Sequence, residues 1–218
     1  SKLGNWTKST VSLITKTFSK STKPKKSRFF LLDRKDAQQT LIIAGHLASA
    51  TGENDEVATT AANDIIGGTF TSRINMNLRE EKGWAYGART LLPDAQQQRP
   101  FIVYAPVQTD KTIDAILELK RELLEYVSNE PATQKEVAKV VSDNVNSLPG
   151  LFETQSSVMG LLSSNVRFTR PDSYIYDYDQ QMLNLDYESG RSAATELIFP
   201  DALICESLHI AQLELIVP

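Results

Sequence analysis

The order of hydrophobic patterns along the chain is the feature that most limits its fold. Two runs of β-favoured residues come first, 28–32 (RFFLL) and 40–48 (TLIIAGHLA), and a polar turn separates them. Helical stripes follow, and then 84–92 and 99–108 flank a polar DAQQQ as the strands of a hairpin would. Strands joined by turns, with helices in separate runs, favour an antiparallel sheet over parallel βαβ units. The expected fold class is α+β, a mainly antiparallel sheet layered with helices.

Two helices are expected between these strand pairs. The first runs to residue 66 with apolar residues at helical spacing, and it stops at Gly67-Gly68. The second buries one side of 72–82 and ends at Gly83, a residue type that suits the position just after a helix. The glycine pair therefore lies at a corner between two helices.

Short polar side chains mark the places where helices begin. The candidate caps are Asn54 or Asp55, Thr71 or Ser72, Asp110, and Thr133, which forms a capping box with Glu136. Pro149-Gly150 separates the fourth helix from a fifth. The tyrosines at 174, 176 and 178 alternate with polar residues as in a short strand, although the helical pattern QQMLNL follows them. Two weaker helices and a terminal strand, LELIVP, complete the expected elements.

The charge balance argues against a nucleic-acid or membrane-surface protein. The chain has 27 acidic and 23 basic residues, so no broad positive field is expected. Six cations between Lys16 and Arg28 surround Pro24, but no interleaved aromatic residues follow that could stack on bases. Residues 1–27 are thus predicted to be a basic connector. No apolar run approaches the roughly 18 residues that span a bilayer. We expect no nucleic-acid partner and no membrane span.

The chain carries no recognisable catalytic centre of its own. Its two histidines, His46 and His209, lie far apart, and neither H-E-x-x-H nor H-x-x-E-H is present. His46 lies within an apolar strand and is interpreted as a structural residue. Cys205 is the single cysteine, and the sequence contains no G-x-S-x-G elbow. The glycine-rich GGTFTS lacks the Gly-Lys-Ser/Thr ending of a phosphate-binding loop. We expect no metal site and no cofactor in this chain.

The most informative segment is 67–88, GGTFTSRINMNLREEKGWAYGA. It resembles the signature of the second homologous domain in each half of the pitrilysin (insulinase-like) zinc metallopeptidases, where G-G-x-x-x-S-R-L leads into L-R-E-x-x-G-x-x-Y. The matching residues are Gly67, Gly68, Ser72, Arg73, Leu78, Arg79, Glu80, Gly83 and Tyr86, with Ile74 in place of the usual leucine. A looser similarity extends from the opening LGNW to the end of the chain.

This resemblance implies a mitochondrial-processing-peptidase-like metallohydrolase fold for residues 28–218, as the C-terminal, non-zinc domain of a half. In the family, two halves clasp a closed chamber and the zinc is bound by the first domain of the first half. The implied partners are a zinc-bearing homologous peptidase domain or subunit and a peptide substrate. The chain opens on an internal-looking sequence, so we expect it to be a segment of a longer protein.

The resemblance also implies a functional pair, Arg79 and Tyr86, which would hold the substrate at the scissile bond. A guanidinium and a phenol both donate hydrogen bonds, and donors aimed at a carbonyl oxygen stabilise the charge that develops on it. The alternative is structural: Arg79 would be an exposed helix charge paired with Glu80 or Glu81, and Tyr86 would pack on a strand.

Four more residues are substrate-binding candidates by the same resemblance, which places this turn on the inner wall opposite the zinc. Gly67 and Gly68 would let a peptide approach bare backbone, and they also serve to break the helix. Ser72 and Arg73 either contact the substrate or cap and stabilise the second helix.

The expected function is a non-catalytic substrate-binding domain of a zinc-dependent metalloendopeptidase, inactive alone because it lacks H-x-x-E-H. The alternative is a catalytically inert scaffold or interaction subunit with the same fold. The presence of both members of the Arg/Tyr pair favours the first. By analogy with the family, the expected location is a bacterial periplasm or cell envelope.

Overall fold

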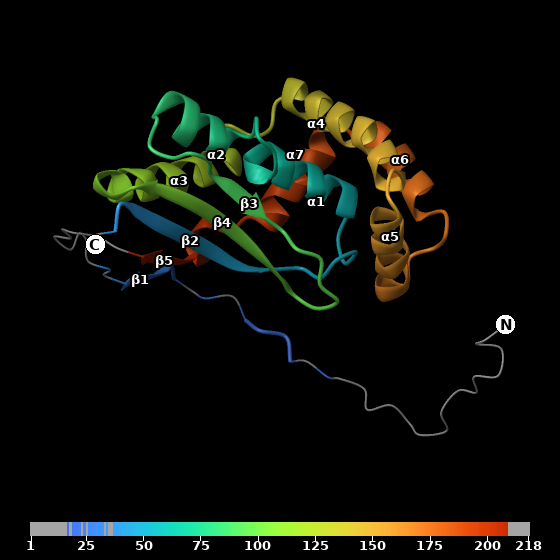
Figure 1. Ribbon diagram of the computed structural model, residues 1–218, viewed down its shortest axis with the longest axis horizontal. Coiled ribbons are helices and arrows are strands. Elements are labelled where there is room, and N and C mark those ends of the chain that lie inside the picture. Colours follow the sequence, from blue (N-terminus) through green and yellow to red (C-terminus); the bar gives the residue numbers. More distant parts are fainter. Residues whose placement is uncertain are drawn as a thin grey trace.

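The computed structural model describes residues 17, 19–22, 24, 26–32, 34 and 37–208, with residues 206–208 described by their backbone. Five strands form one mixed sheet in the order β1-β5-β2-β4-β3 (Figure 1). The strands are β1 (Arg28–Leu32), β2 (Gln39–Ala48), β3 (Arg89–Leu91), β4 (Arg99–Gln108) and β5 (Ile204–Leu208). β1 and β5 are parallel, and the other neighbouring pairs are antiparallel.

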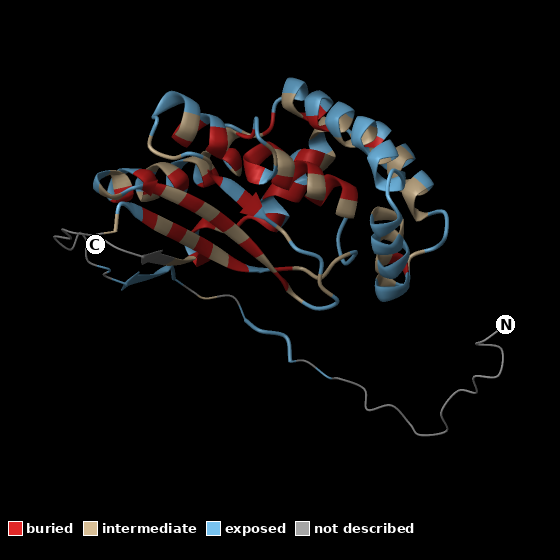
Figure 2. Ribbon diagram, viewed as in Figure 1, coloured by how far each residue is buried: buried red, intermediate tan, exposed pale blue. Residues whose placement is uncertain are grey.

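The two central strands, β2 and β4, have one buried and one open face. Their residues alternate between buried and more exposed positions along each strand (Figure 2), as expected when side chains point to opposite faces in turn. The buried face includes Ile42, Ala44, Phe101, Val103 and Ala105, and the open face includes Leu41, Ile43, Ile102 and Tyr104. The open face is therefore also apolar, and none of the described helices covers it (Figure 1).

The helices lie on the buried face of the sheet and beyond one end of it (Figure 1). The α-helices are α1 (Glu56–Asn63), α2 (Arg73–Asn75), α3 (Thr112–Tyr126), α4 (Gln134–Ser147), α5 (Gln155–Phe168), α6 (Tyr174–Leu183) and α7 (Tyr187–Leu197). Two π-helical turns extend the first two, η1 (Asp64–Gly68) and η2 (Met76–Glu81). Short 3₁₀ turns are η3 (Thr109–Lys111), η4 (Leu148–Phe152) and η5 (Pro200–Ala202). Within the described residues, no helix is both long and apolar enough to cross a bilayer.

The α+β fold class is confirmed, and so are several helix boundaries. Asp55 caps α1 by accepting a hydrogen bond from the Ala58 amide. Thr133 and Glu136 form the expected capping box at the start of α4. Each of these caps depends only on residues within one turn, which is why the sequence reveals them.

Other expectations about local structure were wrong. Asp110 does not cap α3, because it lies within the 3₁₀ turn η3, and the helix begins after Lys111 without a side-chain cap. The alternating tyrosines, for which the sequence left both a short strand and a helix open, belong to helix α6, where the rings of Tyr174 and Tyr178 pack one turn apart with their centroids 6.1 Å from each other. The first hairpin strand is shortened to β3, and an isolated bridge joins Ala85 to Val107. The expected LELIVP strand and His209 lie outside the described residues.

His46 has the structural role expected of it. The residue is buried on β2, and its ring stacks on Phe101 with a centroid separation of 5.2 Å. Its Nε2 accepts a hydrogen bond of 3.2 Å from the backbone amide of Phe199. His46 thereby fixes the segment that follows α7 against the sheet.

Candidate functional site

The glycine pair forms a tight contact between the end of η1 and strand β3. A Cβ atom on Gly67 would lie 2.5 Å from Thr90 Cγ2 and 2.7 Å from the Thr90 backbone nitrogen. A Cβ on Gly68 would instead meet side-chain atoms of the same helical segment, Asp64 Oδ1 and Asn63 Nδ2. Gly67 is therefore required by the approach of the helix end to the strand, independently of any substrate.

These contacts predict different effects for the two glycines. Gly67→Ala should lower the free energy of unfolding by about 1–3 kcal/mol, because the methyl group must displace buried strand backbone. Gly68→Ala is the matched control and should have a smaller effect, since the side chains that it meets can rotate away. Chemical denaturation of both variants measures the difference. Equal losses would show that the close approach to β3 is not what requires glycine at position 67.

A buried asparagine that sequence reasoning missed connects the two halves of the motif. Asn75 donates from Nδ2 to the Phe70 carbonyl at 2.6 Å, and its Oδ1 accepts from the Ala88 amide at 3.0 Å. The side chain is 4% exposed. It therefore ties the glycine-rich turn to the chain that leads into β3. A buried amide that satisfies backbone groups on two segments restricts both of them.

The segment from Gly83 to Tyr86 is also held in place by backbone contacts. Gly83 has φ +66°, a left-handed conformation that ends the helix and favours glycine. The Leu78 carbonyl accepts from the amides of Trp84 and Ala85 at 2.9 and 3.3 Å. The carbonyl of Trp84 accepts from the Gln108 amide at 2.9 Å. Leu78 directly precedes Arg79, and Ala85 directly precedes Tyr86. These hydrogen bonds therefore hold together the backbone positions next to the two residues.

Arg79 lies on η2 with about a third of its side chain exposed. Its guanidinium carbon lies 4.5 Å above the centre of the Phe70 ring, and its Nε is 3.4 Å from a Glu80 carboxylate oxygen. Phe70 is 63% exposed, so this stacking happens at the surface. The arrangement orients the guanidinium and leaves its outer nitrogens without a hydrogen bond to any described residue. Phe70 is a second site residue that the sequence analysis did not identify.

Tyr86 is the most exposed large side chain of the motif, with 85% of its surface accessible. Within the described part of the chain, its hydroxyl forms no hydrogen bond. The structure thus joins the backbone residues that precede Arg79 and Tyr86, and no direct bond joins the two side chains among the described residues. Both keep donors available for a bound molecule.

Arg73 contrasts with Arg79 because its donors are already used. Its Nε and Nη2 bind the two oxygens of Glu136 at 2.6 and 2.7 Å, and the Glu130 and Pro131 carbonyls accept two further bonds. Burial alone would raise the pKa of the Glu136 carboxyl. The hydrogen bonds from Arg73 and Thr133 have the larger combined effect and hold that pKa below its usual value. This geometry favours the stabilising role of Arg73 over substrate contact.

Ser72 also faces inward. It occupies the position before α2, yet its hydroxyl makes no capping hydrogen bond. The residue is 2% exposed, and its Oγ has no hydrogen-bond partner among the described residues. A direct contact between Ser72 and a substrate would need this part of the turn to open.

The described residues contain no group of three or more His, Cys, Asp or Glu side chains placed to hold a metal ion. The side chains present here thus do not fit a catalytic zinc, which needs about three protein ligands. What the site offers is hydrogen-bond donors on a rigid corner.

Comparison with known proteins gives a family match over residues 1–143, to the model described as the peptidase M16 inactive domain. Comparison with curated protein sequences gives no match. Among solved structures, the peptidase M16 inactive domain from Pseudomonas fluorescens aligns over 91% of this chain and 47% of its own, with 22% identity and a TM-score of 0.82. A protease from Helicobacter pylori aligns over 90% and 48%, with 21% identity and a TM-score of 0.80.

The periplasmic protease PqqL from Escherichia coli aligns over 87% of this chain and 21% of its own, with 12% identity and a TM-score of 0.70. At such identities these structures establish the fold. The chain spans about half the length of the first two structures and about a fifth of the third.

Proposed function

The chain belongs to the family of peptidase M16 inactive domains, the non-zinc domains of pitrilysin-type peptidases, and from this premise we propose that it is the substrate-binding domain of a zinc-dependent metalloendopeptidase. It would complete the peptide chamber, while a homologous domain or subunit supplies the zinc and the general base. Arg79 and Tyr86 would donate hydrogen bonds to the carbonyl oxygen of the scissile bond.

One observation carries this proposal: the backbone residues just before Arg79 and Tyr86 are hydrogen-bonded to each other, and the outer guanidinium nitrogens of Arg79 and the hydroxyl of Tyr86 form no hydrogen bond to a described residue. Donors that are already oriented need little reorganisation when charge develops on a carbonyl oxygen, and this is what makes such sites effective. A domain that served only as a scaffold would gain nothing from an 85% exposed phenol on a rigid turn.

The open face of the sheet supports a role within a larger assembly. Leu41, Ile43, Ile102 and Tyr104 are half-buried side chains on the open face of β2 and β4, and none of the described helices covers that face (Figure 1). Contiguous exposed apolar surface marks an interaction site more often than ordinary surface. A second domain or a bound polypeptide would remove it from water.

The proposal predicts that the zinc and the peptidase activity depend on the other half, and metal analysis can test this. The chain alone should hold no stoichiometric zinc and cleave no peptide, because the described part of the chain lacks a suitable ligand set. Adding the zinc-bearing half should produce activity that a chelator removes. One tightly held zinc per chain, with chelator-sensitive activity from this chain alone, would contradict this dependence. If the reconstituted pair stays inactive, the scaffold role becomes the better description.

A further inference from the structure

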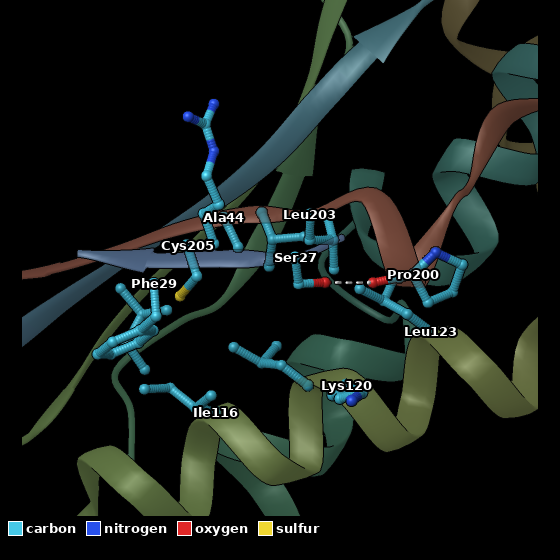
Figure 3. Close-up of a pocket in the computed structure, with 13 residues that line it drawn as sticks. Ser27, Phe29, Ala44, Ile116, Lys120, Leu123, Pro200, Leu203 and Cys205 are labelled. Carbon is cyan, nitrogen blue, oxygen red and sulfur yellow. Dashed lines mark hydrogen bonds between the residues drawn. The ribbon is translucent and has the colours of Figure 1, made fainter. Parts of the chain in front are cut away.

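A small apolar cavity lies at the sheet edge farthest from Arg79 and Tyr86. It is a partly open hollow between α3 and the strands β1, β5, β2 and β4 (Figure 3). Its volume is about 170 Å³. The apolar part of the wall includes Phe29, Ile42, Ile116, Leu119, Leu123 and Cys205. Ser27 closes one end, where its hydroxyl lies 3.5 Å from the Pro200 carbonyl oxygen (Figure 3).

The size of this cavity matches one side chain. An engineered apolar cavity of about 150 Å³ in another protein stays dry and binds benzene. A phenyl ring or a branched aliphatic group would therefore fill the space beneath β1.

The charged residues that line the cavity are both basic. Lys120 on α3 and Arg28 on β1 border it, and no acidic side chain contributes to its wall. Neither cation forms an ion pair with a described residue. Only Lys120 lies on the cavity side, because Arg28 shares the opposite face of β1 with Phe30, whose ring centre is 5.9 Å from the Arg28 guanidinium carbon. A bound group that carries a carboxylate would match this charge, and an amine would be repelled.

The neighbouring strand offers backbone hydrogen bonds. β1 is an edge strand that pairs with β5, and among the described strands none lies on its other side. All five of its residues are exposed, including Phe29, Phe30, Leu31 and Leu32 at 40–49%. An exposed apolar edge of this kind is a template for an added strand.

We propose that the β1 edge and the cavity beneath it form a docking site for the carboxy-terminal residues of an extended peptide. The peptide backbone would extend the sheet beside β1, its last side chain, apolar and of about phenyl size, would enter the cavity, and its carboxylate would lie near Lys120. The site is separate from the Arg79–Tyr86 corner, since β1 and β3 are the opposite edges of the sheet. It does not rest on the proposed peptidase role.

Binding of a defined peptide tests this directly. The probe is the tetrapeptide acetyl-Ala-Val-Thr-Phe with a free carboxylate, compared with its carboxy-terminal amide and with N-acetylphenylalanine, by calorimetry on the full chain. The acid should bind roughly fivefold more tightly than the amide, and N-acetylphenylalanine should bind more weakly than the tetrapeptide because it lacks the strand. Equal affinity of acid and amide, or of the tetrapeptide and N-acetylphenylalanine, would overturn the proposal.

Two further measurements locate the peptide. Lys120→Gln should remove the preference for the acid, whereas Lys135→Gln, which changes an exposed lysine on α4, should keep it. The single cysteine reports occupancy, because Cys205 lines the cavity. Burial raises the pKa of the Cys205 thiol to about 11, so alkylation is followed at pH 9, and the peptide should slow it. Unchanged alkylation in the presence of saturating peptide would show that the cavity is not the site.

Discussion

Tyr86→Phe in the complete peptidase is expected to lower kcat on the order of 10²-fold. The substitution removes one hydroxyl and keeps the ring, and the hydroxyl of Tyr86 has no internal partner in the described structure that would be lost with it. The loss should therefore fall on the reaction and not on folding. Arg79→Ala should be at least as damaging, because it removes a fixed positive charge together with its hydrogen bonds. Steady-state kinetics on a peptide substrate measure both effects.

The surroundings of Arg79 suggest finer variants. Arg79→Lys should restore only part of the activity, since an ammonium cannot reproduce the planar donor fork that stacks on Phe70. Phe70→Leu should act through Arg79 by loosening its orientation, so its effect should largely disappear in an Arg79→Ala background. Phe70 is in this sense a positioning residue.

Glu81→Gln is the matched control, because it changes an exposed charge on the same turn to which we assign no role. Zinc content and thermal stability of the Tyr86 and Arg79 variants should remain near those of the wild type, which separates lost transition-state binding from misfolding. Wild-type kcat/KM in both variants, or an equal loss in Glu81→Gln, would show that the pair is structural.

The elements that could be predicted from sequence are those whose signals are local. The capping box of Thr133 and Glu136 spans three residues, and the glycine that ends η2 adopts the left-handed conformation that its position implied. The runs of β-favoured residues in β2 and β4, bounded by polar turns, predicted these two strands. Each of these features lies within a few residues of its cause.

The features that could not be predicted depend on contacts between distant segments. Arg73 lies on a motif that suggested substrate contact, but its partner Glu136 is 63 residues away and no sequence pattern connects them. Nothing in the sequence pattern links Phe70 to Arg79, and their contact is seen only in the structure, where the Arg79 guanidinium lies over the Phe70 ring. The tyrosines of α6 alternate with polar residues as they would in a strand, but they lie in a helix, where Tyr174 packs against Tyr178. Family resemblance suggested the Arg/Tyr pair, whose role stays a prediction, and the structure shows the backbone bonds that hold the neighbouring residues.

A second large effect is expected at the far end of β4, where Arg99 begins the strand. Its guanidinium binds both carboxylate oxygens of Glu56 at 2.8 and 2.9 Å, and the arginine side chain is only 3% exposed. Glu56 is the first residue of α1 and also accepts from the Gly52 amide at 3.1 Å. This pair therefore fixes the start of α1 to the strand whose other end holds Ala85 and Trp84.

Arg99→Ala should lower the free energy of unfolding by about 3 kcal/mol, because removing one partner leaves the Glu56 carboxylate largely buried without its counter-charge. Lys139→Ala is the comparison, since the ion pair of Lys139 with Asp143 within α4 has both side chains 49% exposed and should contribute only about 0.5 kcal/mol. Denaturant titration of the two variants gives both values.

The double variant Arg99→Met with Glu56→Leu should recover much of the loss, because it leaves no buried charge unpaired. If Arg99→Ala lowered the free energy of unfolding no more than Lys139→Ala, the contact between α1 and β4 would not depend on the Arg99–Glu56 pair. In that case only the sheet would anchor the segment before Tyr86 to β4.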